Sequence, residues 1–167
     1  MNQPDEHWQA WYDRHGPALL LFARQLTHSL AEAEDAMHDG FVRFWKRRGE
    51  VDDPLAYMYR AVRSAALDAG RSAGRRRRRE LSLDYSDRPG VPQPWRDAAR
   101  DETDQQLRDA IGQLPQAQRE VLVMKVWGGL TFDQIAAAID IPRSTSAARY
   151  TAAIKAMRVS LPSKELL

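Results

Sequence analysis

The densest group of side chains suited to ligand binding is a cluster of arginines near the middle of the chain. It comprises the five consecutive arginines Arg75 to Arg79 and, before them, Arg60, Arg63 and Arg71. Guanidinium groups neutralise phosphates and release their counterions, so this density favours a nucleic-acid partner. The alternative is a solvated helix end or an unstructured basic tail, in which adjacent like charges repel one another. Tyr57 and Tyr59 lie beside this surface, where they either stack on unpaired bases or belong to the core.

A second group of ionisable side chains is acidic and precedes the arginines. Glu34, Asp35 and Asp39 share one face of an expected helix with His38 and Arg43. Carboxylates that share a helix face could serve acid–base or metal chemistry, but no partnering cluster stands elsewhere in the chain, which favours a solvated face. The chain has no cysteine, and its four histidines show no ligand spacing. We therefore expect no metal, no cofactor and no enzymatic activity of its own.

A helix-turn-helix is expected near the C-terminus. Thr131 and Gln134 have the spacing of a capping box, which begins a helix with an apolar side of Ile135, Ala136 and Ile139. Asp140-Ile141-Pro142 ends it, because proline does not continue a helix. Ser144 or Thr145 then caps a second helix, whose buried side would be Ala148, Ala152, Ile154 and Met157. Such a unit places its second helix in the DNA major groove, although an ordinary helical hairpin has the same pattern.

The first 80 residues indicate three amphipathic helices with a shared core. One helix, or a broken pair, covers His7 to Thr27, with a possible kink at Gly16-Pro17. A capping box of Ser29 and Glu32 begins the next, whose core stripe is Ala33, Met37, Phe41 and Phe44. Asp53-Pro54 begins the third with an acidic cap and a proline at its first position. The apolar side of this helix is expected to be Leu55, Met58, Val62, Ala65, Ala66 and Ala69.

A segment rich in proline separates these helices from the C-terminal ones. Residues 81–103 lack sustained periodicity, which predicts an extended connector. Short helices follow over Asp104 to Leu114 and from Pro115 to the Gly128-Gly129 stop. The expected fold is all-α, with two small helical domains, 1–80 and 104–167, joined by a flexible linker over 81–103.

Composition restricts the compartment and the partners. The chain of 167 residues has a formal net charge of only +2, so the uneven placement of its charges decides what it binds. No apolar run reaches the length of a membrane span and no signal peptide opens the chain, so we expect a soluble, cytoplasmic protein without membrane insertion.

Three blocks together resemble the bacterial sigma-70 superfamily. They are AEAEDAMHDGFVRFW, YRAVRSAALDAGRSAGRRRRR and LPQAQREVLVMKVWGGLTFDQIAAAIDIPRSTSAAR, and their order and spacing are more specific than any one of them. The short chain is similar to the extracytoplasmic-function (ECF) group, which retains only regions 2 and 4.

The resemblance implies three binding surfaces. The polymerase-binding residues, docked on the β′ clamp helices, would be Glu34, Asp35, His38, Asp39, Phe41, Arg43 and Trp45. Recognition and opening of the −10 element would use the loop from Arg47 to Asp53 and then Tyr59, Arg60, Arg63, Ser64, Asp68, Arg71, Arg75, Arg76 and Arg77. Recognition of the −35 element would use Arg143, Ser144, Thr145, Ala147, Ala148, Arg149 and Thr151. Implied partners are core RNA polymerase (β′ clamp helices and β flap), promoter DNA and an anti-sigma factor.

The sequence departs from the family pattern in the −35 helix. Relatives often have arginines where this chain has Ala147 and Ala152; in the −10 helix, many have asparagine where it has Ser64. From Asp101 to Leu167, eight basic residues face eight acidic ones, so this half carries no net charge. A bidentate arginine–guanine contact contributes about 1–3 kcal/mol of discrimination, and alanine makes none. We therefore expect weak −35 readout and a larger share of promoter affinity from region 2.

Two other functions remain open beside that of a dissociable sigma factor. One is a helix-turn-helix regulator that acts without polymerase; the acidic helix before the arginine-rich one argues against it. The other is an inactive sigma-like interaction module, which the alanine-rich recognition helix keeps open.

Overall fold

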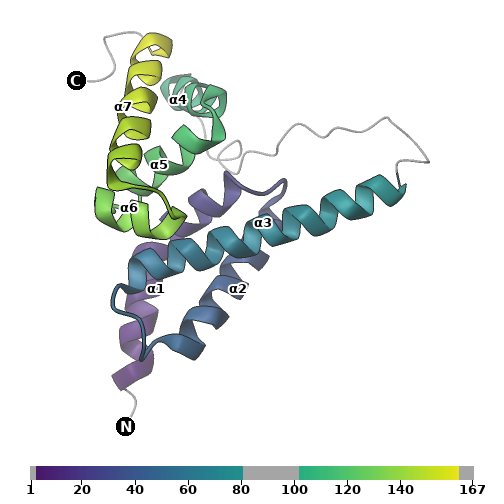
Figure 1. Cartoon of the computed structure of the whole chain (residues 1–167), viewed down its shortest axis with the longest axis vertical. Coiled ribbons are helices and arrows are strands. Elements are labelled where there is room, and N and C mark those ends of the chain that lie inside the picture. Colours follow the sequence, from purple (N-terminus) through teal and green to yellow (C-terminus); the bar gives the residue numbers. More distant parts are fainter. Residues whose placement is uncertain (1–2, 81–101, 162–167) are drawn as a thin grey trace.

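The described part of the chain is all helical. The computed structural model describes residues 3–80 and 102–161, and their side chains over 7–72 and 105–161. Seven helices and no strand are found in these ranges, which confirms the predicted fold class (Figure 1). The helices are α1 (Gln3–Arg24), α2 (Leu30–Arg47), α3 (Pro54–Glu80), α4 (Glu102–Gln113), α5 (Gln116–Val126), α6 (Phe132–Ile139) and α7 (Arg143–Ser160). Most of the predicted linker, residues 81–101, lies outside the described residues.

Helix starts in the N-terminal half follow the predicted caps closely. The Ser29 hydroxyl accepts a hydrogen bond from the Glu32 amide at 3.1 Å, while the Glu32 carboxylate accepts from the His28 amide at 2.9 Å. In a capping box the amide of Ser29 would donate this second bond, whereas here the donor is the amide of His28. Asp53 caps α3 as predicted, since its Oδ1 accepts from the Ala56 amide at 3.1 Å. Of the two alternatives for the first segment, a single helix is found, with Pro17 inside it.

Helices α2 and α3 form the closest pair in the fold. A Cβ on Gly40 would lie only 2.7 Å from a methyl group of Val62 and 3.0 Å from its backbone nitrogen, so only glycine allows this approach. The predicted core stripes largely meet here: buried residues include Ala33, Met37, Phe44, Met58, Val62, Ala65 and Ala66, and Phe41 is half-buried. Ala69 is exposed, contrary to the prediction, because α3 has by then passed beyond its neighbours.

The predicted helix-turn-helix is present as α6 and α7. Both bonds of the capping box are made: the Thr131 amide donates to Gln134 Oε1 at 2.9 Å, and the Gln134 amide donates to Thr131 Oγ1 at 3.1 Å. Asp140 ends α6 in the left-handed region, at φ 54°. Helix α7 begins earlier than predicted, directly after Pro142, and neither predicted side-chain cap is used.

The buried side of α7 differs from the prediction. It consists of Ser146, Ala153 and Met157, whereas Ala148 is exposed and Ala152 and Ile154 are half-buried. The hydroxyl of Ser146 is fully buried and lies within hydrogen-bond distance of the carbonyl oxygens of Arg143 (2.7 Å) and Phe132 (3.2 Å). A hydrogen-bonded serine thus occupies a buried position of α7 that the pattern of apolar residues did not predict.

The main hydrophobic core crosses the predicted boundary between the two halves. One cluster joins Leu19 and Phe22 of α1 and Tyr59 of α3 to Met124 of α5 and Ile135 of α6. Helix α6 lies along α3, and α1 contacts α5 (Figure 1). A second cluster joins α4, α5 and α7 through Ile111, Leu114, Leu122, Ala153, Met157 and Leu161. The division into two domains stays a prediction, but in this arrangement the core is continuous across it.

Candidate polymerase and nucleic-acid interfaces

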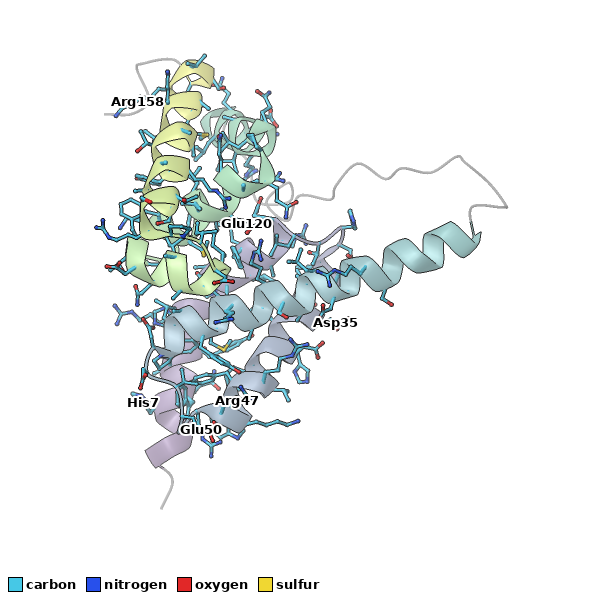
Figure 2. All side chains as sticks on the ribbon, viewed as in Figure 1. His7, Asp35, Arg47, Glu50, Glu120 and Arg158 are labelled. Carbon is cyan, nitrogen blue, oxygen red and sulfur yellow. The ribbon has the colours of Figure 1, made fainter. Side chains whose placement is uncertain are left out.

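The acidic side of α2 is open to solvent. Glu34, Asp35, His38 and Asp39 are all exposed. In the view of Figure 2, Asp35 lies below α3 and projects away from the helices of the C-terminal half. The opposite side of α2 carries the buried residues Ala33, Ala36, Met37, Gly40 and Phe44, so packing holds the carboxylates outward. This face can therefore bind a partner with complementary positive charge.

Aromatic rings support this acidic face from behind. Phe41 and Trp45, both half-buried, stack with ring centroids 6.1 Å apart. Trp8 of α1 meets Trp45 edge to face at 5.9 Å, and Tyr12 meets Phe41 in the same way at 5.8 Å. The two rings of α2 thus pack this helix against α1.

Arg43 points toward α3 rather than belonging to the acidic face. Its guanidinium donates to the Ser64 hydroxyl at 3.3 Å and lies 3.8 Å from the Asp68 carboxylate. Asp68 also lies 4.0 Å from Arg71 on its own helix. One predicted polymerase-binding residue therefore contacts the predicted −10 residues, a connection that linear spacing does not show. All four side chains are exposed, so we expect this network to contribute little to the free energy of folding.

The predicted −10 residues of α3 occupy two environments. Arg60, Ser64, Asp68 and Arg71 are exposed, whereas Arg63 is half-buried and Tyr59 is fully buried. The Tyr59 ring meets Phe22 at 5.0 Å, and its hydroxyl is buried without a hydrogen-bond partner among the described residues. Burial raises the pKa of this phenol. Arg75, Arg76 and Arg77 lie within α3, and their side chains are outside the described residues.

Arg63 is held by a carboxylate from the other half of the chain. Its Nε donates to Glu120 Oε2 of α5 at 2.9 Å, and the Glu120 side chain is only 3% exposed. The other carboxylate oxygen of Glu120 accepts from Gln116 Nε2 at 2.9 Å. Figure 2 shows Glu120 above α3, between the two groups of helices. A carboxylate so buried is stable as an ion only with such partners, so the arrangement depends on Arg63.

A second polar contact joins the loop from Arg47 to Asp53 with α6. While Asp53 Oδ1 caps α3, its Oδ2 accepts a hydrogen bond from Gln134 Nε2 at 3.0 Å. Gln134 is also the third residue of the α6 capping box, so one amide group connects the starts of two helices. An open hollow of about 290 Å³ next to this contact is lined by the loop, Tyr57, Arg60 and Ala137 of α6.

The predicted −35 helix presents mainly short side chains. Ser144, Ala148 and Thr151 are exposed, and Thr145, Ala147 and Arg149 are half-buried. Arg143 is exposed and pairs with Asp133 of α6 at 3.3 Å. Helix α7 is thus accessible along these positions, with Arg143 already engaged by a carboxylate.

Sequence reasoning missed the residues that join the two halves. Glu120 and Gln134 were assigned no binding or positioning role beyond the cap, yet they bond to Arg63 and Asp53 of the other half. A partial signal exists only for Glu120, a lone acid directly before the apolar run Val121 to Met124. Its partner, 57 residues earlier in sequence, has no local signature.

The described residues contain neither a cluster of metal ligands nor a membrane span. Within these ranges no three side chains of histidine, cysteine, aspartate or glutamate come together as metal ligands. None of the helices, so far as they are described, is both long and apolar enough to cross a bilayer.

Comparison with known proteins assigns the family. Sigma-70 region 2 matches residues 11–76, and Sigma-70, region 4, matches residues 104–157. The chain belongs to the sigma-70 family. The ECF RNA polymerase sigma factor SigL of Mycobacterium tuberculosis is 30% identical over 158 residues, which cover 92% of this chain and 88% of SigL, in the strains Erdman and H37Rv alike. Within the family, the chain is therefore of the ECF type, as the resemblance implied.

A solved structure has the same overall fold. It is the sigma factor RpoE in complex with the anti-sigma factor NepR from Bartonella quintana, with a TM-score of 0.71 over 95% of this chain and 99% of that one. The identity is 18%, so this likeness concerns the fold.

Proposed function

We propose that the chain is a dissociable ECF-type sigma factor, which binds core RNA polymerase and directs it to promoters. The observation that carries this proposal is the closely packed α2–α3 pair, which presents exposed carboxylates on one helix and arginines on the next. Gly40 allows the two helices to approach closely at Val62, so the two surfaces lie side by side. Such a unit suits a protein that must bind the polymerase and the DNA together.

Each surface has a proposed role. Glu34, Asp35, His38 and Asp39 bind the β′ clamp helices, with Phe41 and Trp45 positioning α2. Arg60, Arg63 and the later arginines of α3 hold opened −10 DNA, and α7 contacts the −35 element next to the β flap. Nucleotide addition remains with the polymerase, so the chain contributes binding and strand capture and not covalent chemistry.

We also propose that an anti-sigma factor regulates the chain. The solved relative RpoE is described in complex with such a partner, NepR. The open groove of about 640 Å³ between α1 and α2, lined by Tyr12, Met37 and Phe41, adds an apolar surface beside the acidic face. A partner that covers this groove would also compete with the polymerase.

Run-off transcription tests the proposed function. Purified protein, core polymerase and promoter fragments are mixed, and specific transcripts support the sigma-factor role. Specific DNA binding that does not depend on polymerase would instead indicate a helix-turn-helix regulator. If neither is observed, the chain is an interaction module. The double variant Asp35→Ala, Asp39→Ala should lose polymerase binding while retaining its helical content.

A further inference from the structure

The surface of α3 proposed for −10 DNA contains a carboxylate among its cations. This carboxylate belongs to a hollow of about 300 Å³ whose α3 side is lined by Arg60, Arg63, Ser64, Asp68 and Arg71. An uncompensated charge on Asp68 would repel the phosphates of a bound strand and oppose what the arginines contribute. A surface that binds DNA therefore gains from a cation that neutralises Asp68.

Helix α2 supplies such a cation. The Arg43 guanidinium has Nη1 3.3 Å from Ser64 Oγ and Nη2 3.8 Å from Asp68 Oδ2. Ser64 and Asp68 are four residues apart and so lie one turn apart on the same side of α3, where a forked guanidinium can face both. Arg71 lies farther from Asp68, at 4.0 Å, and its side chain is 75% exposed. Arg43 is thus the nearer partner, and it alone also contacts Ser64 among these cations.

The close approach of α2 and α3 sets this contact. Gly40, one turn before Arg43 on α2, lies against Val62, two residues before Ser64 on α3. The side chains of Arg43 and Asp68 are 44% and 58% exposed, and so exposed a pair contributes little to the stability of the fold. A strand bound to α3 would lie against the pair and remove water from it, which strengthens the attraction between the two charges. The contact therefore matters most when the surface is occupied.

We propose that Arg43 is a positioning residue of the −10 surface: it neutralises Asp68 and orients the Ser64 hydroxyl toward an acceptor atom of an opened base. Because Ser64 Oγ accepts from the guanidinium, its own hydrogen remains available as a donor to a ring nitrogen or a carbonyl oxygen of the base. The inference rests on the proposed −10 role of α3. It departs from the resemblance, which places Arg43 at the polymerase interface.

The base preference of the assembled holoenzyme is the main readout. The full chain with core polymerase is incubated with single-stranded DNA that carries a randomised segment, and the bound strands are sequenced. Ser64→Ala identifies the position that Ser64 reads, because the preference there is lost. Arg43→Gln should weaken the preference at the same position by about two- to fivefold, the range of an exposed charged contact. The double variant should lose no more than Ser64→Ala alone, because the two residues act as a unit.

Lys46→Gln is the matched control for the loss of a positive charge. Lys46 is an exposed residue of α2 that lines the groove toward Trp8 of α1. Its replacement should leave the base preference unchanged. Arg43→Lys, which keeps the charge but not the fork, should restore the total affinity for DNA and only part of the preference. If Lys46→Gln and Arg43→Gln change the preference alike, or if neither Ser64→Ala nor Arg43→Gln changes it, the proposal is wrong.

Binding to core polymerase is titrated separately, without DNA. Arg43→Gln should bind core polymerase within about twofold of the parent, whereas the double variant Asp35→Ala, Asp39→Ala loses this binding. Loss of core binding by folded Arg43→Gln would overturn the proposal and return Arg43 to the polymerase interface.

Two controls separate the possible failures. Circular dichroism checks folding; if Arg43→Gln is unfolded, Arg43→Lys takes its place, and an unchanged base preference in that variant overturns the proposal. A parent chain that never binds core polymerase would remove the proposed function itself. A parent preference that depends on Ser64 but survives in Arg43→Gln would remove only the role of Arg43.

Discussion

Replacing Tyr59 by phenylalanine should stabilise this protein. The Tyr59 ring is fully buried against Phe22 at 5.0 Å, yet its hydroxyl has no hydrogen-bond partner among the described residues. An unsatisfied buried polar group costs about 1–3 kcal/mol, whereas the ring packing is the same in phenylalanine. Removing the hydroxyl should therefore raise the free energy of unfolding by about 1 kcal/mol or more. For a chain of this size each kcal/mol raises Tm by about 2–4 °C.

The pH dependence supplies an independent measurement of the same burial. Burial raises the pKa of Tyr59 above its ordinary value of 10.0, because the charged form is desolvated. The stability tied to this neutral phenol is fully present below that ordinary value and is lost as pH rises above it, since the unfolded chain ionises first. Urea unfolding at pH 8 and at alkaline pH should thus show a larger loss of stability for the parent than for Tyr59→Phe.

A destabilising effect of Tyr59→Phe would refute this reasoning. A decrease of more than about 1 kcal/mol would mean that the hydroxyl makes a hydrogen bond in solution beyond the contacts described above. An equal alkaline decrease in the two proteins would mean that the ring is exposed in solution. Tyr12→Phe is the control, because Tyr12 is 40% exposed and its change should leave stability within about 0.5 kcal/mol.

The remaining predictions concern packing, the turn of the helix-turn-helix and the arginine run. Gly40→Leu should destabilise the fold by about 1–3 kcal/mol in urea titrations, because its side chain collides with Val62, whereas Gly49→Ala, in open space, should have little effect. Ser146→Ala should cost about 0.5–1.5 kcal/mol because the hydrogen bonds of the hydroxyl are removed, and a stabilised variant would show that the buried hydroxyl is not hydrogen-bonded. Replacing Arg75 to Arg79 by serine should weaken single-stranded DNA binding and reduce the salt dependence of log K by about 0.7 for every phosphate that is no longer neutralised, with polymerase binding unchanged; the reverse result would mean that the two surfaces are assigned wrongly.

The structure refines the hypothesis of weak −35 readout without testing it. The predicted contact positions are at least partly accessible. Ala148, which the sequence pattern placed in the core, is exposed to solvent. The exposed positions Ser144, Ala148 and Thr151 have side chains too short for bidentate contacts with guanine. Helix α7 is therefore available to DNA, while its chemistry still favours a smaller contribution than that of α3.

Local sequence determined most of the helices and the starts of α2, α3 and α6, whereas the start of α7 was predicted too late in the chain. Capping at Thr131 and Asp53 needs only residues within three positions, and the apolar stripes of α2 and α3 follow from helical periodicity. The order of the three sequence blocks likewise indicated the family. These features are encoded by neighbours in sequence, which is why they could be predicted.

Only the tertiary structure decided how the surfaces relate to one another. The bond between Arg63 and Glu120 joins residues 57 positions apart, and that between Asp53 and Gln134 joins residues 81 apart, so no local pattern announces either. Tyr59 fitted a stacking surface or a core equally well until α1, α5 and α6 were placed around it. Burial depends on which elements approach a side chain from elsewhere in the sequence, and this is the property that periodicity along one helix does not contain.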